Sequence, residues 1–139
     1  MPAGNGSSLR RAALRVAAGV AVLFGIATVA SGGNVLFGSG AAAAGDYVPL
    51  VVWFNFIAGF FYVAAGFGLW RRRRWAAWLA LALAVLTALA FAAFGWHVLA
   101  GGAFEARTVA AMTLRTLVWT AIAALACFGS IFHFHKDLP

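Results

Sequence analysis

Four long apolar segments constrain this chain more than any other feature of its sequence. They cover about residues 12–30, 48–70, 75–100 and 108–132. Each is near or above the ~20 residues that an α-helix needs to cross a ~30 Å hydrocarbon core. None shows the polar–apolar alternation typical of barrel strands, and in lipid the backbone must satisfy its own hydrogen bonds. We therefore predict an all-α transmembrane fold with four helices over these ranges.

The composition excludes an ordinary soluble domain. Apolar residues make up 65% of the 139 residues and charged residues only 9%, whereas soluble domains have roughly 45–50% and about 25%. A soluble domain of this size could not bury so much apolar surface. We predict one transmembrane domain over residues 9–132, between a disordered N-terminal tail (1–8) and a short cytoplasmic tail (133–139).

The basic residues predict the orientation. Seven arginines lie in the N-terminal region and in the second connection: Arg10, Arg11, Arg15, Arg71, Arg72, Arg73 and Arg74. The first connection has no Lys or Arg, and the third has only Arg107. Because positive residues flanking membrane helices favour the cytoplasmic side, we predict that both termini are cytoplasmic. The formal net charge of +7 then reflects contact with anionic lipid, and we expect no nucleic-acid partner.

The first apolar segment allows a second interpretation. Arginines followed by an apolar run and by Thr28, Val29 and Ala30 also fit a cleavable signal peptide. The run is long for a signal peptide and ends in glycines, which favours a retained helix. Cleavage would leave three helices in the same orientation.

Small residues recur at helical spacing in every segment. The third segment has the stripe Ala76, Ala80, Ala84, Ala88 and Ala92, and the fourth has Thr116, Thr120 and Ala124. The first two offer Ala21 and Gly25, and Gly59 and Gly66. Such residues let membrane helices approach closely. They predict a four-helix bundle with antiparallel neighbours, and they fit a homo-oligomer or a larger membrane complex equally well.

Polar residues inside the apolar segments are the candidate binding residues. Asn55 and Arg115 lie at similar depth below the outer surface, and His97 and Glu105 lie near the outer ends of the third and fourth helices. Two interpretations compete. In the structural one, Arg115 pairs with Glu105 and Asn55 bridges helices. In the functional one, the four residues line a pocket for a quinone, a lipid head group or a small metabolite, because intramembrane ionisable residues commonly mark functional sites.

The residues give little support for a haem site, a metal site or carboxylate-driven transport. His97 and the pair His133 and His135 lie at opposite ends, so they cannot hold one haem. The spacing of His133, His135 and Asp137 is weak evidence for a metal. The carboxylates Asp46, Glu105 and Asp137 fall in loops or at ends, which disfavours a carboxylate-driven antiporter. We predict no catalytic residues and no metal site. The residues indicate no cofactor, and a bound quinone stays an alternative.

Two stretches carry a resemblance to a known group. They are LRVAAGVAVLFGIATVASG and FIAGFFYVAAGFGLWRRRRWAAWLALALAV, and their layout resembles the small bacterial four-helix membrane proteins of the DoxX-like group. The resemblance implies a bacterial inner membrane and a quinone-linked or accessory role. Such proteins tend to have an acidic residue where this chain has Asn55, so no functional residue is carried over.

Three hypotheses follow. The first is a membrane-embedded accessory subunit or binding module without catalytic activity of its own. The second is a quinone-linked redox component that uses the outer polar residues. The third is a small oligomeric transporter or channel with a water-lined path between subunits.

Overall fold

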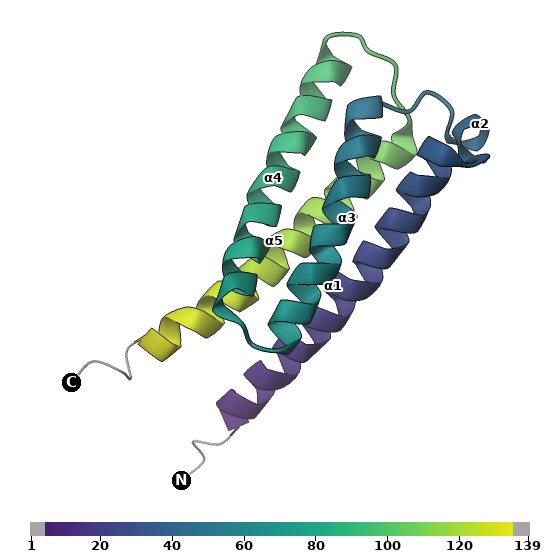
Figure 1. Cartoon of the computed structure of the whole chain (residues 1–139). Helices are drawn as coiled ribbons and strands as arrows, with labels where there is room; N and C mark the ends of the chain where they lie inside the picture. Colours follow the sequence, from purple (N-terminus) through teal and green to yellow (C-terminus); the bar gives the residue numbers. More distant parts are fainter. Residues whose placement is uncertain (1–4, 135–139) are drawn as a thin grey trace.

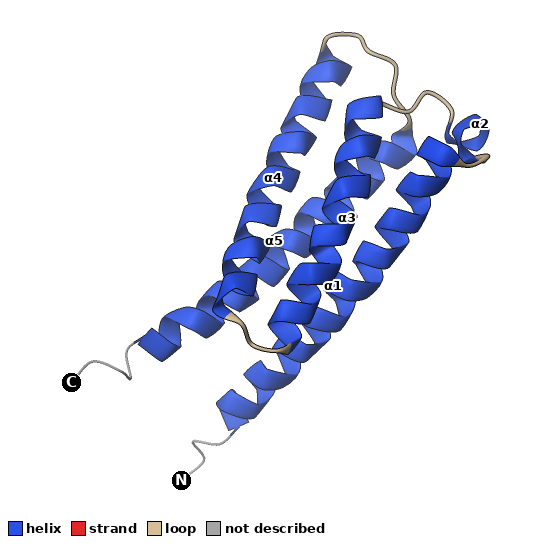
Figure 2. Cartoon of the chain, viewed as in Figure 1, coloured by secondary structure: helices blue, strands red, loops and turns tan. Residues whose placement is uncertain are grey.

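The chain is helical over most of the residues that the computed structural model describes, which are 5–134, with side chains described for 5–129. The helices are α1 (Asn5–Phe37), α2 (Gly40–Ala44), α3 (Pro49–Trp70), α4 (Arg74–Leu99) and α5 (Ala106–Phe134). No strand occurs in this part of the chain (Figure 2). The prediction of an all-helical chain is confirmed for these residues.

Four of the helices are long and apolar enough to cross a membrane: α1, α3, α4 and the portion Ala106–Gly129 of α5. Their surfaces carry large apolar side chains that an aqueous protein would bury, among them Leu23, Phe60, Trp78, Leu89 and Leu117. Lipid is the solvent that accepts such a surface. These helices indicate a multi-pass membrane protein.

The long helices lie side by side, and α2 stands at one end of them (Figure 1). α1 packs most extensively against α3, α3 packs against α4, and α4 packs against α5, whereas α1 and α5 share few contacts. The start of α1, the end of α5 and the turn between α3 and α4 lie at one end, which we call the arginine end because it carries Arg71–Arg74 (Figure 1). The opposite end, with α2 and the α4–α5 connection, is called the loop end.

α1 is longer than the predicted 12–30 at both ends. It begins at Asn5, inside the tail predicted to be disordered over 1–8, and it continues through the glycines that were expected to form a loop. Gly32 and Gly33 pack against Phe56 of α3, and the Phe37 ring meets those of Phe56 and Trp53 edge-on, at 5.6 and 5.8 Å. This tertiary packing compensates for the low helix propensity of the glycines.

The other helices follow the predicted ranges closely. α3 starts at Pro49, a residue well suited to the first position of a helix, and α4 is shifted by one residue from 75–100. α5 starts two residues before Thr108 and reaches Phe134, so it enters the predicted tail 133–139. The rest of that tail, 135–139, lies outside the described residues, as do residues 1–4.

The C-terminal ends of α3 and α4 have the same backbone hydrogen-bond pattern. After α4, Gly101 has φ +84° and the N–H of Gly102 donates to His97 O at 2.9 Å. After α3, Arg72 has φ +55° and the N–H of Arg73 donates to Gly68 O at 2.9 Å. This six-to-one bond closes both helices with a left-handed residue. The α3–α4 turn therefore stays short and keeps four consecutive arginines together.

The α1–α3 contact is close because glycines face backbone. A Cβ placed on Gly25 would lie 2.8 Å from the Gly59 carbonyl oxygen, and one on Gly66 would lie 2.8 Å from Ala18 O. Such separations allow only glycine. The predicted close-packing role of Gly25, Gly59 and Gly66 is confirmed, and it follows the small-residue rule of membrane helices.

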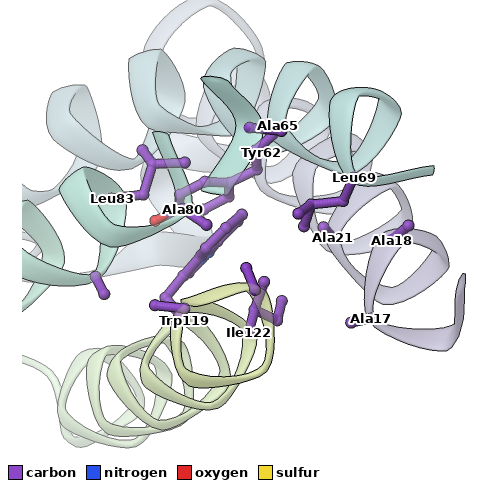
Figure 3. Close-up of a cluster of buried hydrophobic side chains, with 14 of the residues drawn as sticks. Ala17, Ala18, Ala21, Tyr62, Ala65, Leu69, Ala80, Leu83, Trp119 and Ile122 are labelled. Carbon is purple, nitrogen blue, oxygen red and sulfur yellow. The ribbon is translucent and has the colours of Figure 1, made fainter. Parts of the chain in front are cut away.

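The main core, drawn in Figure 3, is a cluster of buried apolar side chains from all four long helices. The positions of its residues along the helices place it in the half of the molecule near the arginine end. Trp119 of α5 inserts between α3 and α4, and its ring centroid is 4.5 Å from that of Tyr62. Alanines surround this pair on α1, α3 and α4. We call this cluster the alanine–tryptophan core; it comprises Ala17, Ala18, Ala21, Ala58, Tyr62, Ala65, Leu69, Ala76, Ala80, Leu83, Ala84, Trp119, Ile122, Ala123 and Ala126.

Two predicted packing stripes need correction. Ala76, Ala80 and Ala84 are buried as expected, but Ala88 and Ala92 are exposed because the buried face of α4 continues through Thr87 and Phe94. On α5, Thr120 and Ala124 are exposed, and Thr120 donates to its own helix at Thr116 O. A strict four-residue stripe drifts around a helix of 3.6 residues per turn, so it leaves the contact after about three positions.

Candidate functional site

A cavity of about 400 Å³ opens between α1, α3 and α5 in the half of the molecule near the loop end. α1 contributes Thr28, Ser31, Gly32, Asn34 and Val35; α2 and the segment after it contribute Gly40, Ala43, Ala44, Tyr47 and Val48; α3 contributes Val51, Val52 and Asn55; the α4–α5 connection contributes Glu105; and α5 contributes Arg107, Thr108, Ala111 and Arg115. Its size suits a small ligand or one end of a larger one.

Arg115 is the charged residue most deeply placed in this cavity. It lies about two and a half turns into α5, roughly 13 Å along the helix axis, and its side chain is only 7% exposed. Nη2 donates to Thr28 Oγ1 of α1 at 3.5 Å, and the guanidinium carbon lies 5.5 Å from the centre of the Phe24 ring. The arginine thus reaches from α5 across to α1.

The hydrogen bonds of Arg115 are weak ones. Nη1 donates to Met112 Sδ at 3.6 Å, and a thioether sulfur is a poor acceptor. Nε is buried and has no partner among the described residues. No carboxylate in this part of the chain pairs with the guanidinium, so the predicted Arg115–Glu105 pair does not form. The cation is therefore buried with spare donors, an arrangement that usually signals a missing partner.

Asn55 lies near Arg115, because both side chains contact the sulfur of Met112. Its Nδ2 donates to Met112 Sδ at 3.8 Å, and its Oδ1 is buried without a partner among the described residues. Met112 is fully buried and fixes the amide of α3 and the guanidinium of α5 at one point. Asn55 does connect two helices, as the structural interpretation expected, but its acceptor oxygen stays unused.

The mouth of the cavity is held by α5 and the α1–α3 connection. Arg107 Nη2 donates to Ala43 O of α2 at 2.8 Å, and Glu105 Oε1 accepts the backbone N–H of Asp46 at 3.1 Å. Gly45, with φ +67°, brings the backbone directly against the Glu105 side chain. Glu105 is thus committed to the backbone of the connection, which explains why it does not reach Arg115.

His97 is not among the residues that line the cavity. One of its ring nitrogens, Nε2, is 3.0 Å from Ala103 O, and its ring packs on Gly102 in the α4–α5 connection. Of the four predicted site residues, Asn55, Glu105 and Arg115 come together, and His97 closes a loop elsewhere.

Residues 5–129 hold no group of three His, Cys, Asp or Glu side chains placed to bind a metal. The candidate tail residues His135 and Asp137, and the side chain of His133, lie outside the described part. Cys127 is a free, half-buried thiol on α5, remote from the cavity lining.

Sequence reasoning missed Thr28, the first-helix partner of Arg115. A threonine in an apolar helix commonly bonds its own backbone, so nothing in the pattern marked it. It also missed the role of Arg107 at the mouth, which depends on the unexpected helix α2.

Comparisons with known protein families, curated proteins and solved structures find no match for this chain. Any inference about function therefore rests on the residues that line the cavity. The cavity combines one buried cation with spare donors, one buried amide oxygen and an apolar wall of valines, an arrangement whose chemistry can accept a polar or anionic group.

Proposed function

We propose that this chain is a small membrane-embedded binding module, without catalytic activity of its own, that holds a polar or anionic ligand in the cavity around Arg115. It would serve as an accessory subunit that presents or senses this ligand in a bacterial inner membrane. The transmembrane unit would be an antiparallel four-helix bundle with both termini cytoplasmic.

The observation that carries the proposal is the burial of Arg115 without a carboxylate. A charged side chain within a membrane helix costs roughly 2.5–3.5 kcal/mol on insertion scales. A purely structural arginine would recover part of that cost through strong acceptors, but Arg115 has a sulfur, a distant hydroxyl and a ring face. An anionic or strongly accepting ligand would supply what is missing.

The orientation is supported by the distribution of arginines. Arg71–Arg74 and the N-terminal arginines of α1 belong to the arginine end, and positive residues favour the cytoplasmic side. The cavity then faces the opposite side of the membrane. The layout of the sequence, which resembles that of DoxX-like proteins, is the basis for proposing a bacterial inner membrane.

A binding role fits the cavity better than a catalytic one. Among the described lining residues, Glu105 is the only carboxylate, and one of its oxygens already accepts the backbone N–H of Asp46. His97, the described imidazole, lies outside the lining, so Glu105 is the single candidate base for the lining hydroxyls of Thr28, Ser31, Tyr47 and Thr108. A quinone-linked redox role would use the same cavity, with a quinone carbonyl as the acceptor for Arg115.

A thermal-shift screen of detergent-purified protein tests the proposal. The probes are ubiquinone and menaquinone analogues, anionic lipids and small organic anions, applied to wild type, Arg115→Gln and Arg73→Gln. Arg73 is an exposed arginine at the far end, so Arg73→Gln removes the same charge without touching the cavity.

We expect at least one probe to raise the midpoint of wild type and Arg73→Gln by several degrees, and that of Arg115→Gln not at all. A ligand at 100 times its Kd adds about 2.7 kcal/mol of stability. Equal shifts in wild type and Arg115→Gln would place the ligand elsewhere. A wild type that no probe stabilises would overturn the binding role.

A further inference from the structure

Three buried side-chain atoms have no hydrogen-bond partner among the described residues. Trp119 Nε1 lies in the alanine–tryptophan core, whereas the other two belong to residues that line the cavity and differ in hydrogen-bond character. Arg115 Nε is a donor and Asn55 Oδ1 is an acceptor. Nη1 of Arg115 and Nδ2 of Asn55 contact the same Met112 sulfur, at 3.6 and 3.8 Å, so the two side chains lie close together although they come from α5 and α3. A ligand that satisfies both unpartnered atoms presents an acceptor to Arg115 and a donor to Asn55.

The charges that line the cavity restrict the ligand further. Glu105 and the exposed Arg107 lie at the mouth, where their opposite charges offset each other, and Arg115 leaves one buried positive charge. An uncompensated charge is costly in the buried part of the cavity. A monoanion neutralises the site, whereas a neutral ligand leaves one positive charge and a dianion leaves one negative charge.

The shape of the cavity separates a polar end from an apolar wall. Val35, Val48, Val51 and Val52 line it from α1 and α3, while Arg115 and Thr28 form a polar contact across it. The volume of about 400 Å³ is too small for a phospholipid with two chains. It accommodates a head group with a short chain, or the first part of a single long chain.

We infer that the cavity binds a 2-hydroxycarboxylate, whose carboxylate accepts hydrogen bonds from Arg115 and whose hydroxyl donates to Asn55 Oδ1. This inference rests on the proposed binding function and specifies its ligand class. A carboxylate carries the single negative charge that the lining requires, and its two oxygens match the planar donors of a guanidinium. The adjacent hydroxyl supplies the donor that Asn55 lacks.

Two sources offer this chemistry: small water-soluble hydroxy acids that enter from the aqueous side, and 2-hydroxy fatty acids that enter from the bilayer. The test therefore uses matched pairs that differ by one hydroxyl. Lactate and propionate form the soluble pair, and 2-hydroxydodecanoate and dodecanoate form the lipid pair. 1-Dodecanol is the uncharged control, and methyl phosphate is the control for a dianion.

Binding of these probes to detergent-purified protein is measured by calorimetry. Within the pair that binds, we expect the 2-hydroxy acid to bind about tenfold more tightly than its partner, which corresponds to one hydrogen bond to a buried acceptor. Asn55→Leu should remove this difference and retain binding of the simple acid. Arg115→Gln should abolish binding of both acids, and Arg73→Gln should change neither.

Asn55→Asp provides a second variant if Asn55→Leu fails to fold. Its carboxylate would pair with Arg115 within the protein and exclude an added acid, so binding should be lost while the midpoint of the empty protein rises. Bound acid in Asn55→Asp with wild-type affinity would contradict the inference.

Failure of this inference differs from failure of the proposed function. Equal binding of hydroxy and simple acids by wild type, or a preference for methyl phosphate or 1-dodecanol, overturns the ligand class. If quinones stabilise the protein through Arg115 and no carboxylate binds, the binding module stands and the hydroxycarboxylate does not. If no probe of either screen binds, both proposals are overturned.

Discussion

The two halves of this molecule use the same helices in opposite ways. Near the arginine end, Trp119 fills the space between α3 and α4, and alanines on three helices close around it. Near the loop end, the same helix α5 carries Arg115 and leaves a cavity against α1. The seam between α1 and α3 is tight in both halves because glycines line it. The cavity therefore depends on α5, whose side chains fill the space near the arginine end and leave it open near the loop end.

This contrast shows how a short membrane protein can be stable and still bind a ligand. One half supplies the packing that holds the helices together, without buried charge in the alanine–tryptophan core. The other half bears an incompletely paired cation. The packing near the arginine end offsets the free-energy cost of burying the Arg115 cation near the loop end. Substitutions in one half can therefore be compared with matched substitutions in the other.

Access to water gives the largest expected difference between the halves. Ala111 lines the cavity and Ala123 belongs to the alanine–tryptophan core, and both are alanines of α5. In a Cys127→Ala background, we expect Ala111→Cys to react with a charged maleimide at least about 100-fold faster than Ala123→Cys, because a buried thiol must wait for local opening. Similar rates for the two thiols would show that the cavity is closed to water or that the core is open.

Removal of the central tryptophan gives the next largest effect. Trp119 is fully buried, whereas the side chain of Trp78 is 74% exposed. We expect Trp119→Ala to lower the free energy of unfolding by about 3–5 kcal/mol through loss of packing, and Trp78→Ala to change it by about 0.5 kcal/mol or less. Unfolding in mixed micelles of increasing SDS content measures both. Comparable losses would mean that the core near the arginine end does not dominate stability.

The seam between α1 and α3 predicts a smaller effect. Gly25→Ala forces a methyl group against the Gly59 carbonyl oxygen, while a Cβ on Gly95 of α4 meets nothing within 4 Å. Gly25→Ala should destabilise the protein by about 1–3 kcal/mol. Gly95→Ala should leave it unchanged or stabilise it by up to about 1 kcal/mol, because alanine has the higher helix propensity. The same SDS titration applies, and stabilisation by Gly25→Ala would show that the helices are further apart than described.

The sequence predicts the helices better than it predicts their contacts. Hydropathy, together with the Arg71–Arg74 block between the two segments, located α3 and α4 to within a residue or so, because the length of a membrane helix is set by the bilayer. It missed the extension of α1, because Gly32 and Gly33 look like breakers until Phe56 packs on them. The packing face of α5 was missed for a similar reason: Trp119 is the buried residue, and the threonines bond to their own backbone.

The candidate site was predicted in part. Depth along the helices brought Asn55 and Arg115 to one level, because rise per residue converts sequence separation into distance. It could not reveal that the carboxylate of Glu105 turns to the backbone of Asp46, or that His97 caps its own loop. These two hydrogen bonds depend on the backbone conformation of the connections between helices, which the sequence pattern does not specify.

The length of α1 has a consequence for how a ligand arrives. With 33 residues, α1 measures about 50 Å, well beyond a hydrocarbon core of ~30 Å. Its apolar stretch 12–30 measures about 28 Å, which matches the core. The polar ends of α1 therefore extend into the head-group layers, with Ser31 and Asn34 at the boundary. The cavity floor at Thr28 lies just beneath that boundary, so a single-chain amphiphile could move sideways from the leaflet into the protein with its head group at nearly constant depth.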